Sequence, residues 1–221
     1  MLNTVIFDMD GLLIDSEPLW GEAMGEVFAQ MGIHLTPEHY QHTTGLRTSE
    51  VVDYWYHHFK WQDKAPGLVT GEIIEKVTEK ILGRGAAMDG LDYILGFFSA
   101  HDFKIGLASS SPMGLIRSVL EHLHIRRYFQ AVYSAEFETH GKPHPAVYLA
   151  CAEELNSYPM ECIVFEDSIT GLIAAKAARM KTVVVPEAHR RGDPRYVLAD
   201  MQLNSLSEFN ENSIKLLEGG K

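Results

Sequence analysis

Short apolar runs that end in polar residues are the feature that most restricts how this chain can fold. The run at residues 4–8 stops at an Asp-Met-Asp-Gly cluster, and beyond residue 102 apolar runs alternate with helical patterns. The later strands are expected at residues 103–108, 131–134, 162–165 and 182–185, with Leu203 in a last edge strand. Strands that alternate with amphipathic helices predict a parallel sheet covered by helices on both faces. The predicted fold class is therefore α/β, with three layers.

A long helical stretch separates the first strand from the others. Residues 16–83 show helical stripes such as Trp20, Met24 and Val27, and no strand pattern. Asp15 or Ser16 can cap the first of these helices. Residues 83–87 are rich in glycine and alanine, which indicates a linker or hinge. We expect a discontinuous core at residues 1–14 and 88–221, with an inserted α-helical cap domain at residues 15–87.

Composition and charge narrow the classes of partner. The chain has 221 residues, 46% of them hydrophobic, and a formal net charge of −11. It lacks the run of ~20 apolar residues that a membrane span needs, and it has no basic stripe for nucleic acid. Its two cysteines, Cys151 and Cys162, suit reduced thiols. We expect a cytoplasmic monomer that binds neither membrane nor nucleic acid.

Polar side chains follow several of the expected strands. They are Asp8 and Asp10 after the first strand, Ser109 and Ser110 after the second, Lys142 in a later loop, and Glu166 and Asp167 after the strand at 162–165. Ligands of open α/β sheets bind beyond the carboxyl ends of the strands. Carboxylates that meet there repel one another unless a cation lies among them. Hard oxygen ligands of this kind suit Mg²⁺, together with waters and a phosphate oxygen.

Four segments carry a resemblance to a known family. The first is Asp8-Met9-Asp10-Gly11-Leu12-Leu13, and the second is Ser109 at the end of an apolar strand. Lys142 in Gly-Lys-Pro-His-Pro is the third, and Glu166-Asp167-Ser168 is the fourth. In this order, and over essentially the whole chain, they resemble the signatures of the haloacid dehalogenase-like superfamily. The chain most resembles the branch of 2-deoxyglucose-6-phosphate phosphatases, hexitol phosphatases and β-phosphoglucomutase, which implies a Rossmann-like core.

The resemblance implies a role for each of these residues. Asp8 would attack phosphorus and form an aspartyl-phosphate, and Asp10 would act as general acid and base. Mg²⁺ would be held by Asp8, Asp167, the backbone carbonyl of Asp10, and Glu166 directly or through water. Ser109, Ser110 and Lys142 would bind the phosphate. The implied substrate is a small phosphorylated sugar or polyol.

The cap offers fewer clues. By the resemblance, Gly45, Leu46 and Arg47 lie in a substrate-specificity loop, and Arg47 would meet an anionic or hydroxyl-rich group. Trp20 would stack on a sugar, although its helical stripe favours a place in the core. Three further side chains are assigned no role in the chemistry: Ser111 is expected to cap a helix, and Arg190 and Arg191 are expected to face solvent.

Two other functions compete with a magnesium-dependent phosphatase. A β-phosphoglucomutase-type enzyme would return the phosphoryl group to a sugar, but Trp20 falls where the mutases of this branch carry a cap histidine. A non-catalytic binding protein would not need both Asp8 and Asp10. Removal of halide is disfavoured because the dehalogenases of the family lack the second aspartate. Release of phosphate or accumulation of an isomer would discriminate the first two.

Overall fold

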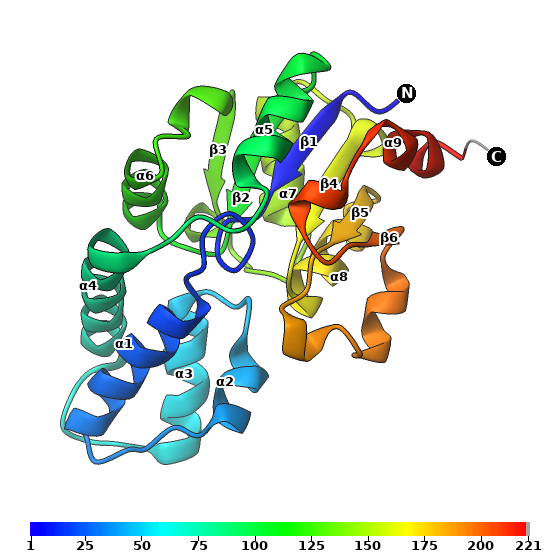
Figure 1. Cartoon of the computed structure of the whole chain (residues 1–221). Coiled ribbons are helices and arrows are strands. Elements are labelled where there is room, and N and C mark those ends of the chain that lie inside the picture. The colour runs from blue at the N-terminus through cyan, green and yellow to red at the C-terminus, as the bar shows by residue number, and fades with distance from the viewer. Residues whose placement is uncertain (220–221) are drawn as a thin grey trace.

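A six-stranded parallel sheet forms the centre of the molecule (Figure 1). The computed structural model describes residues 1–219, apart from the side chains of residues 37 and 41. The strands are β1 (Thr4–Phe7), β2 (Lys104–Ser109), β3 (Ala131–Ser134), β4 (Cys162–Glu166), β5 (Lys181–Val184) and β6 (Met201–Gln202). Their order is β3-β2-β1-β4-β5-β6, and every neighbouring pair is parallel. The predicted α/β class is confirmed, and the last edge strand ends just before Leu203.

Helices cover both faces of this sheet. On one face lie α5 (Leu91–Ala100), α6 (Met113–His122) and α9 (Glu211–Leu217), and on the other α7 (Ala146–Glu154) and α8 (Ile169–Ala177). Successive strand residues alternate between the two layers, so Val5 and Phe7 pack in the first core and Ile6 in the second. Because both faces are buried, the strands read as continuous apolar runs rather than alternating ones.

Short 3₁₀ helices occupy the connections. They span Arg126–Tyr128, Ala135–Phe137, Pro159–Glu161, Ala188–Arg190, Pro194–Leu198 and Leu206–Glu208. The two ends of the described chain meet on one side of the core, where the backbone N–H of Leu2 donates to Glu218 at 2.7 Å (Figure 1). Within the described residues, no helix has the length and apolar character to cross a membrane.

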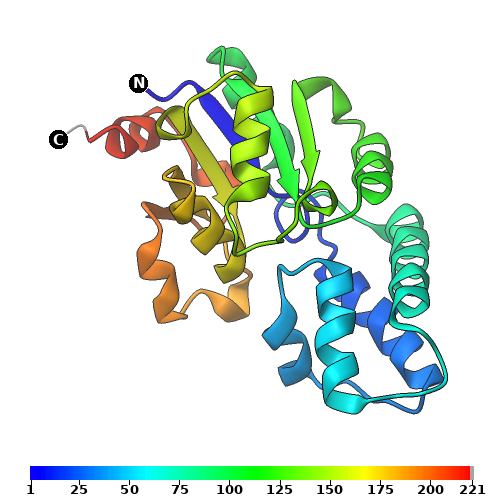
Figure 2. The same cartoon turned by 180° about the vertical axis from the view of Figure 1, so that it is seen from behind.

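Four helices between β1 and α5 form a separate layer beyond the carboxyl ends of the strands (Figures 1 and 2). They are α1 (Glu17–Gln30), α2 (Pro37–Thr43), α3 (Thr48–Phe59) and α4 (Pro66–Arg84). They share an apolar cluster of their own, which includes Phe28, Trp55 and Ile73. The chain leaves and returns at one place, because Asp15 N–H donates to the Ala86 carbonyl at 2.9 Å. We refer to α1–α4 as the helical cover.

Candidate active site

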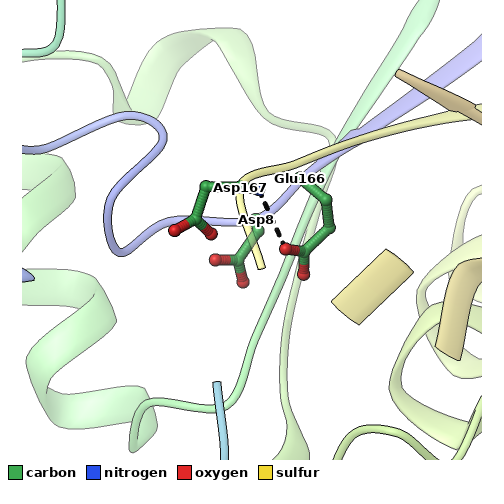
Figure 3. A group of neighbouring side chains, drawn as sticks. All are labelled: Asp8, Glu166 and Asp167. Carbon is green, nitrogen blue, oxygen red and sulfur yellow. Dashed lines mark hydrogen bonds between the residues drawn. The ribbon is translucent and has the colours of Figure 1, made fainter. Parts of the chain in front are cut away.

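The order of the strands brings three distant parts of the chain to one edge of the sheet. Because β1 lies between β2 and β4, Asp8, Ser109 and Glu166 emerge side by side at the carboxyl ends of their strands. The backbone N–H of Asp8 donates to the carbonyl of Phe165 at 3.0 Å, which fixes its position beside β4. Figure 3 shows the carboxylates of Asp8 and Asp167 turned toward the same space, with Glu166 next to them.

Lys142 is a buried cation that bonds both Asp8 and Glu166. Its ammonium donates to Asp8 Oδ1 at 2.6 Å, to Glu166 Oε1 at 2.7 Å and to the Ala108 carbonyl at 3.3 Å. The side chain is only 2% exposed and lies 4.8 Å from the ring centroid of Tyr148. Burial alone would lower the pKa of Lys142, but the charges of Asp8 and Glu166 outweigh burial and raise it. The ammonium therefore stays charged at neutral pH.

Glu166 holds the loop that follows β4. Its Oε1 accepts from Lys142 and from the Tyr148 hydroxyl at 2.6 Å. Its Oε2 accepts from the backbone N–H groups of Asp167 and Ser168 and from the Ser168 hydroxyl. Burial would raise the pKa of Glu166, but Lys142 and these hydrogen bonds lower it. With five donors on two oxygens, Glu166 suits contact with a metal through water better than direct ligation.

The carboxylates at this edge of the sheet outnumber the cations that pair with them. Asp8, Glu166 and Asp167 each offer a carboxylate oxygen, and these oxygens lie within 4.8 Å of one another. Among the described residues, Lys142 is the one cation that forms ion pairs with this group. Burial, then the charges of Glu166, Glu17 and Asp8, raises the pKa of Asp167 well above its ordinary value. Burial also raises the pKa of Asp8 to about 7, against the opposing effect of Lys142. A divalent cation bound by oxygen ligands fits this deficit.

Asp10 is held by two hydroxyl donors and one indole donor, which come from two parts of the chain. Its Oδ1 accepts from the Ser16 hydroxyl at 2.7 Å and from the Trp20 indole N–H at 2.8 Å. Its Oδ2 accepts from the Ser111 hydroxyl at 2.7 Å. Neither serine side chain caps a helix, since α1 and α6 have no side-chain cap hydrogen bond and the cap residue of α6 is Pro112. Ser16 is the N-cap residue of α1, as predicted, but its hydroxyl bonds Asp10 instead of the helix backbone. The predicted capping role of Ser111 was wrong, because its hydroxyl also bonds Asp10.

A compact turn places Asp10 beside Asp8. The backbone N–H of Gly11 donates to the Ile14 carbonyl at 3.0 Å, and Gly11 has a φ of +72°. A Cβ on Gly11 would lie 2.6 Å from Asp167 Oδ2. A residue with a side chain would therefore be strained there and would press on a carboxylate of the site.

Ser109 and Ser110 both reach the site, and they have different contacts. Ser109 is buried, and its Oγ accepts from the N–H of Ser111 at 3.0 Å. Ser110 Oγ donates to the Gly45 carbonyl at 2.9 Å, so it joins the core to the helical cover. Helix α6 starts just beyond them, with its N-terminus toward the same edge.

A cavity of about 360 Å³ separates this edge from the helical cover. The catalytic candidates that line it are Asp8, Asp10, Ser109, Ser110, Lys142 and Asp167, and the cover contributes Trp20, Gly45 and Leu46. Trp20 also packs against the cores of both layers, so its apolar body is part of the core while its N–H serves Asp10. The structure thus brings together all the predicted residues except Glu166, which lies behind them, and Arg47.

Arg47 points away from the cavity. Its guanidinium donates to the carbonyls of Ala135, Glu138 and Thr139 and forms an ion pair with Glu50 at 2.6 Å. Glu50 in turn accepts from the N–H of Gly141 at 3.3 Å. Arg47 therefore fastens α3 to the loop that carries Lys142.

The sequence alone did not identify three charged residues that line the cavity. Arg190 was expected to face solvent, but its Nη2 donates to Thr44 Oγ1 at 3.0 Å. Glu17 and Glu187 lie in the same wall. Burial, followed by the charges of Asp10 and Glu187, raises the pKa of Glu17 to about 7. No motif marked these residues, because their meeting depends on how the β5–β6 segment folds toward the cover.

The fold and the site together define an α/β enzyme centred on buried carboxylates at the carboxyl edge of its sheet. A family model described as haloacid dehalogenase-like hydrolase matches residues 5–185. The chain belongs to this family.

Relatives and solved structures agree with this assignment. The chain is 40% identical over 210 residues to hexitol phosphatase B of Escherichia coli K12, with 95% of each chain covered. It is 30% identical over 181 residues to a fructose-1-phosphate phosphatase of the same organism, covering 82% of this chain and 95% of the relative. CbbY from Rhodobacter sphaeroides, crystallised with phosphate, has a TM-score of 0.85 at 22% identity and covers 94% of this chain and 96% of its own. β-Phosphoglucomutase from Clostridium difficile has the same score and identity, covering 99% and 98%.

Proposed function

We propose that this enzyme is a magnesium-dependent phosphatase that hydrolyses a small phosphorylated sugar or polyol, of the hexitol phosphate type, through an aspartyl-phosphate. The observation that carries the proposal is the pairing of Asp8 and Asp10 on one wall of a cavity. Asp8 is held by a buried ammonium, and Asp10 by three neutral donors. The relatives named hexitol phosphatase and fructose-1-phosphate phosphatase support this substrate class.

The reaction follows from the positions of the two aspartates. Lys142 occupies Asp8 Oδ1, so Oδ2 is the oxygen left to attack phosphorus and form the acyl-phosphate. Asp10, two residues on, gives its proton to the leaving oxygen of the substrate and then takes a proton from the attacking water. Lys142 and the N-terminal end of α6 lie where negative charge develops on the transferring group. Ser109 binds a phosphate oxygen in the same place.

The acidic group suits Mg²⁺, with Asp8, Asp167 and the backbone carbonyl of Asp10 as ligands and Glu166 behind them. When bound, the ion would screen the carboxylates from the phosphate and let the two anions approach. Asp167 fits a ligand role because, among the described residues, no group donates a hydrogen bond to its carboxylate. Its position is fixed instead through the backbone, where its carbonyl accepts from the Tyr196 hydroxyl at 2.6 Å.

The helical cover is proposed to be a cap domain, at residues 15–87, that closes over the substrate and excludes water. The contacts between the cover and the core through Ser110, Arg47 and Arg190 support this proposal. The hinges are proposed at residues 13–17 and 83–87, where the two crossing segments lie together. We further propose that the enzyme is a cytoplasmic monomer, consistent with its free buried cysteines.

A β-phosphoglucomutase-type reaction is the second candidate, because enzymes of that name share the fold. At 22% identity that likeness concerns architecture alone. Trp20 favours the phosphatase, since an indole can donate a hydrogen bond to Asp10 but cannot relay a proton to and from a sugar hydroxyl.

Release of inorganic phosphate tests the proposal. The purified protein is incubated with Mg²⁺ and a panel of hexitol, hexose and pentose phosphates, and both phosphate and sugar isomers are measured. We expect phosphate from hexitol phosphates and no isomer. Accumulation of an isomer without phosphate would establish the mutase instead.

The nucleophile is tested by Asp8→Asn. We expect turnover to fall at least about 10³-fold because an amide cannot attack phosphorus, while circular dichroism stays unchanged. Mass spectrometry of rapidly quenched wild-type enzyme should show a phosphate on the peptide that contains Asp8. A normal rate in the variant would refute the assignment of Asp8.

A further inference from the structure

Next to the catalytic candidates, the cavity is lined by a second set of charged groups. Glu17 at the start of α1 and Glu187 and Arg190 in the segment after β5 meet there. Arg190 Nη2 bonds Thr44 Oγ1 at 3.0 Å, and Arg190 Nε lies 3.6 Å from Glu187 Oε2. Glu17 is half-buried, accepts no hydrogen bond from any described residue, and lines the cavity. These groups take no part in the chemistry proposed above.

From this geometry we propose that Glu17, Glu187 and Arg190 form a subsite for the hydroxyl groups of an uncharged carbon chain, and that the subsite rejects a second phosphate. The proposal rests on the proposed phosphatase function and narrows its substrate to monophosphates. A carboxylate accepts hydrogen bonds from neighbouring hydroxyls, and the guanidinium donates to their lone pairs. A phosphate in the same place would face two carboxylates and one cation.

The cations in and near the cavity are already engaged by other groups, which supports rejection of a second phosphate. Lys142 is occupied by Asp8 and Glu166. Arg47, which could have met a second anion, is occupied by backbone carbonyls and Glu50. Of the described residues that line the cavity, Arg190 and His189 are the remaining basic ones, and Arg190 already lies beside Glu187.

This arrangement also bears on the choice between hydrolysis and transfer. An enzyme that passes a phosphoryl group from Asp8 to a second position of a sugar monophosphate must accommodate a bisphosphate. A wall that repels the second phosphate destabilises the bound bisphosphate. The aspartyl-phosphate is then hydrolysed by water instead of being transferred to a sugar.

Binding to the Asp8→Asn variant tests the subsite without depending on turnover. Calorimetry at pH 8 with excess Mg²⁺ compares sorbitol 6-phosphate with sorbitol 1,6-bisphosphate. We expect the monophosphate to bind at least about tenfold more tightly. Adding Glu17→Gln or Glu187→Gln should weaken binding of the monophosphate and reduce this preference to within about threefold, because each change removes a negative charge and keeps the shape.

Glu153→Gln in the same background is the matched control, since Glu153 is an exposed carboxylate on α7. It should leave the preference intact. Equal or tighter binding of the bisphosphate, or a preference that survives both Gln substitutions, would overturn the subsite. Failure of the wild-type enzyme to release phosphate from any monophosphate would refute the phosphatase function, and the binding preference would still be measured.

Discussion

Asp10 shows how one side chain can be positioned by residues that no local motif connects. Ser16 and Trp20 belong to the helical cover side of the chain, and Ser111 belongs to the loop before α6. All three donors reach Asp10 because the helical cover packs against the core in this way. The orientation of Asp10 is therefore coupled to the position of α1.

Trp20→Phe removes one of these donors and keeps an aromatic ring of similar shape. A hydrogen bond to a charged group contributes about 1.5–3 kcal/mol, so we expect kcat to fall about ten- to hundredfold. KM should change little, because the substrate loses no contact with its phosphate. Steady-state kinetics on a hexitol phosphate measures both constants.

Trp61→Phe is the matched control for Trp20→Phe. Trp61 lies in the same helical cover and also loses an indole hydrogen bond, to the Lys64 carbonyl at 2.9 Å, but it does not line the cavity. This variant should lose stability and keep kcat. An equal fall in kcat for both variants would mean that Trp20 acts only through folding of the cover.

Glu17 makes stability depend on pH. Burial and neighbouring carboxylates raise its pKa from 4.5 to about 7, so the folded state binds the proton more tightly than the unfolded state. The stability that this proton supplies is complete below about pH 4.5 and is lost as the pH rises through about 7. In EDTA, the midpoint of thermal unfolding should therefore fall between pH 5 and 8, and less in Glu17→Gln. A profile that is the same in both proteins would contradict the raised pKa.

Among the elements, the turn between α2 and α3 controls how closely the cover approaches the core. Gly45 has a φ of +81°, and a Cβ there would collide with Thr170 Oγ1 and lie 2.9 Å from Ser168 Oγ. Its carbonyl accepts from Ser110 at 2.9 Å. A glycine at this position therefore permits contact that a side chain would prevent.

Gly45→Ala is expected to hold the cover away from the core. We predict at least a tenfold loss in kcat/KM on a hexitol phosphate, because the cavity can no longer close around the substrate. Gly71→Ala in α4 is the control, since a Cβ there meets nothing within 4 Å. That variant should keep its activity and gain about 0.5–1 kcal/mol of stability. Unchanged activity in Gly45→Ala would show that close approach at this turn is dispensable.

For the whole molecule, Mg²⁺ should link activity to stability. Three buried carboxylates lie together and Lys142 pairs with only two of them, so a bound divalent ion relieves repulsion in the folded state alone. At 100 times its dissociation constant the ion would add about 2.7 kcal/mol. EDTA should abolish turnover and lower the midpoint of thermal unfolding, and added Mg²⁺ should restore both. Full activity in EDTA would contradict the metal's role.

The order of elements and the core motifs could be predicted because they depend on local signals. Buried strands on both faces read as apolar runs, and the polar residues at their ends mark the carboxyl edge. Strands β1 to β5 were all predicted to within a residue at each end. The predicted positions of Asp8, Ser109, Lys142 and Asp167 around one cavity follow from the same pattern.

Contacts between the two layers could not be predicted in this way. Whether Arg47 or Arg190 faces the cavity depends on how the cover packs against loops about 90 and 150 residues away in the chain. The periodicity of apolar residues gives no information about such contacts. The hydroxyls of Ser16 and Ser111 looked like helix caps because a short-range partner is the default for serine before a helix. Local patterns therefore determine the chemistry that this chain offers at its sheet edge. Docking of the helices over that edge decides which side chains orient Asp10 and which meet the substrate, because those contacts join residues that are distant in the chain.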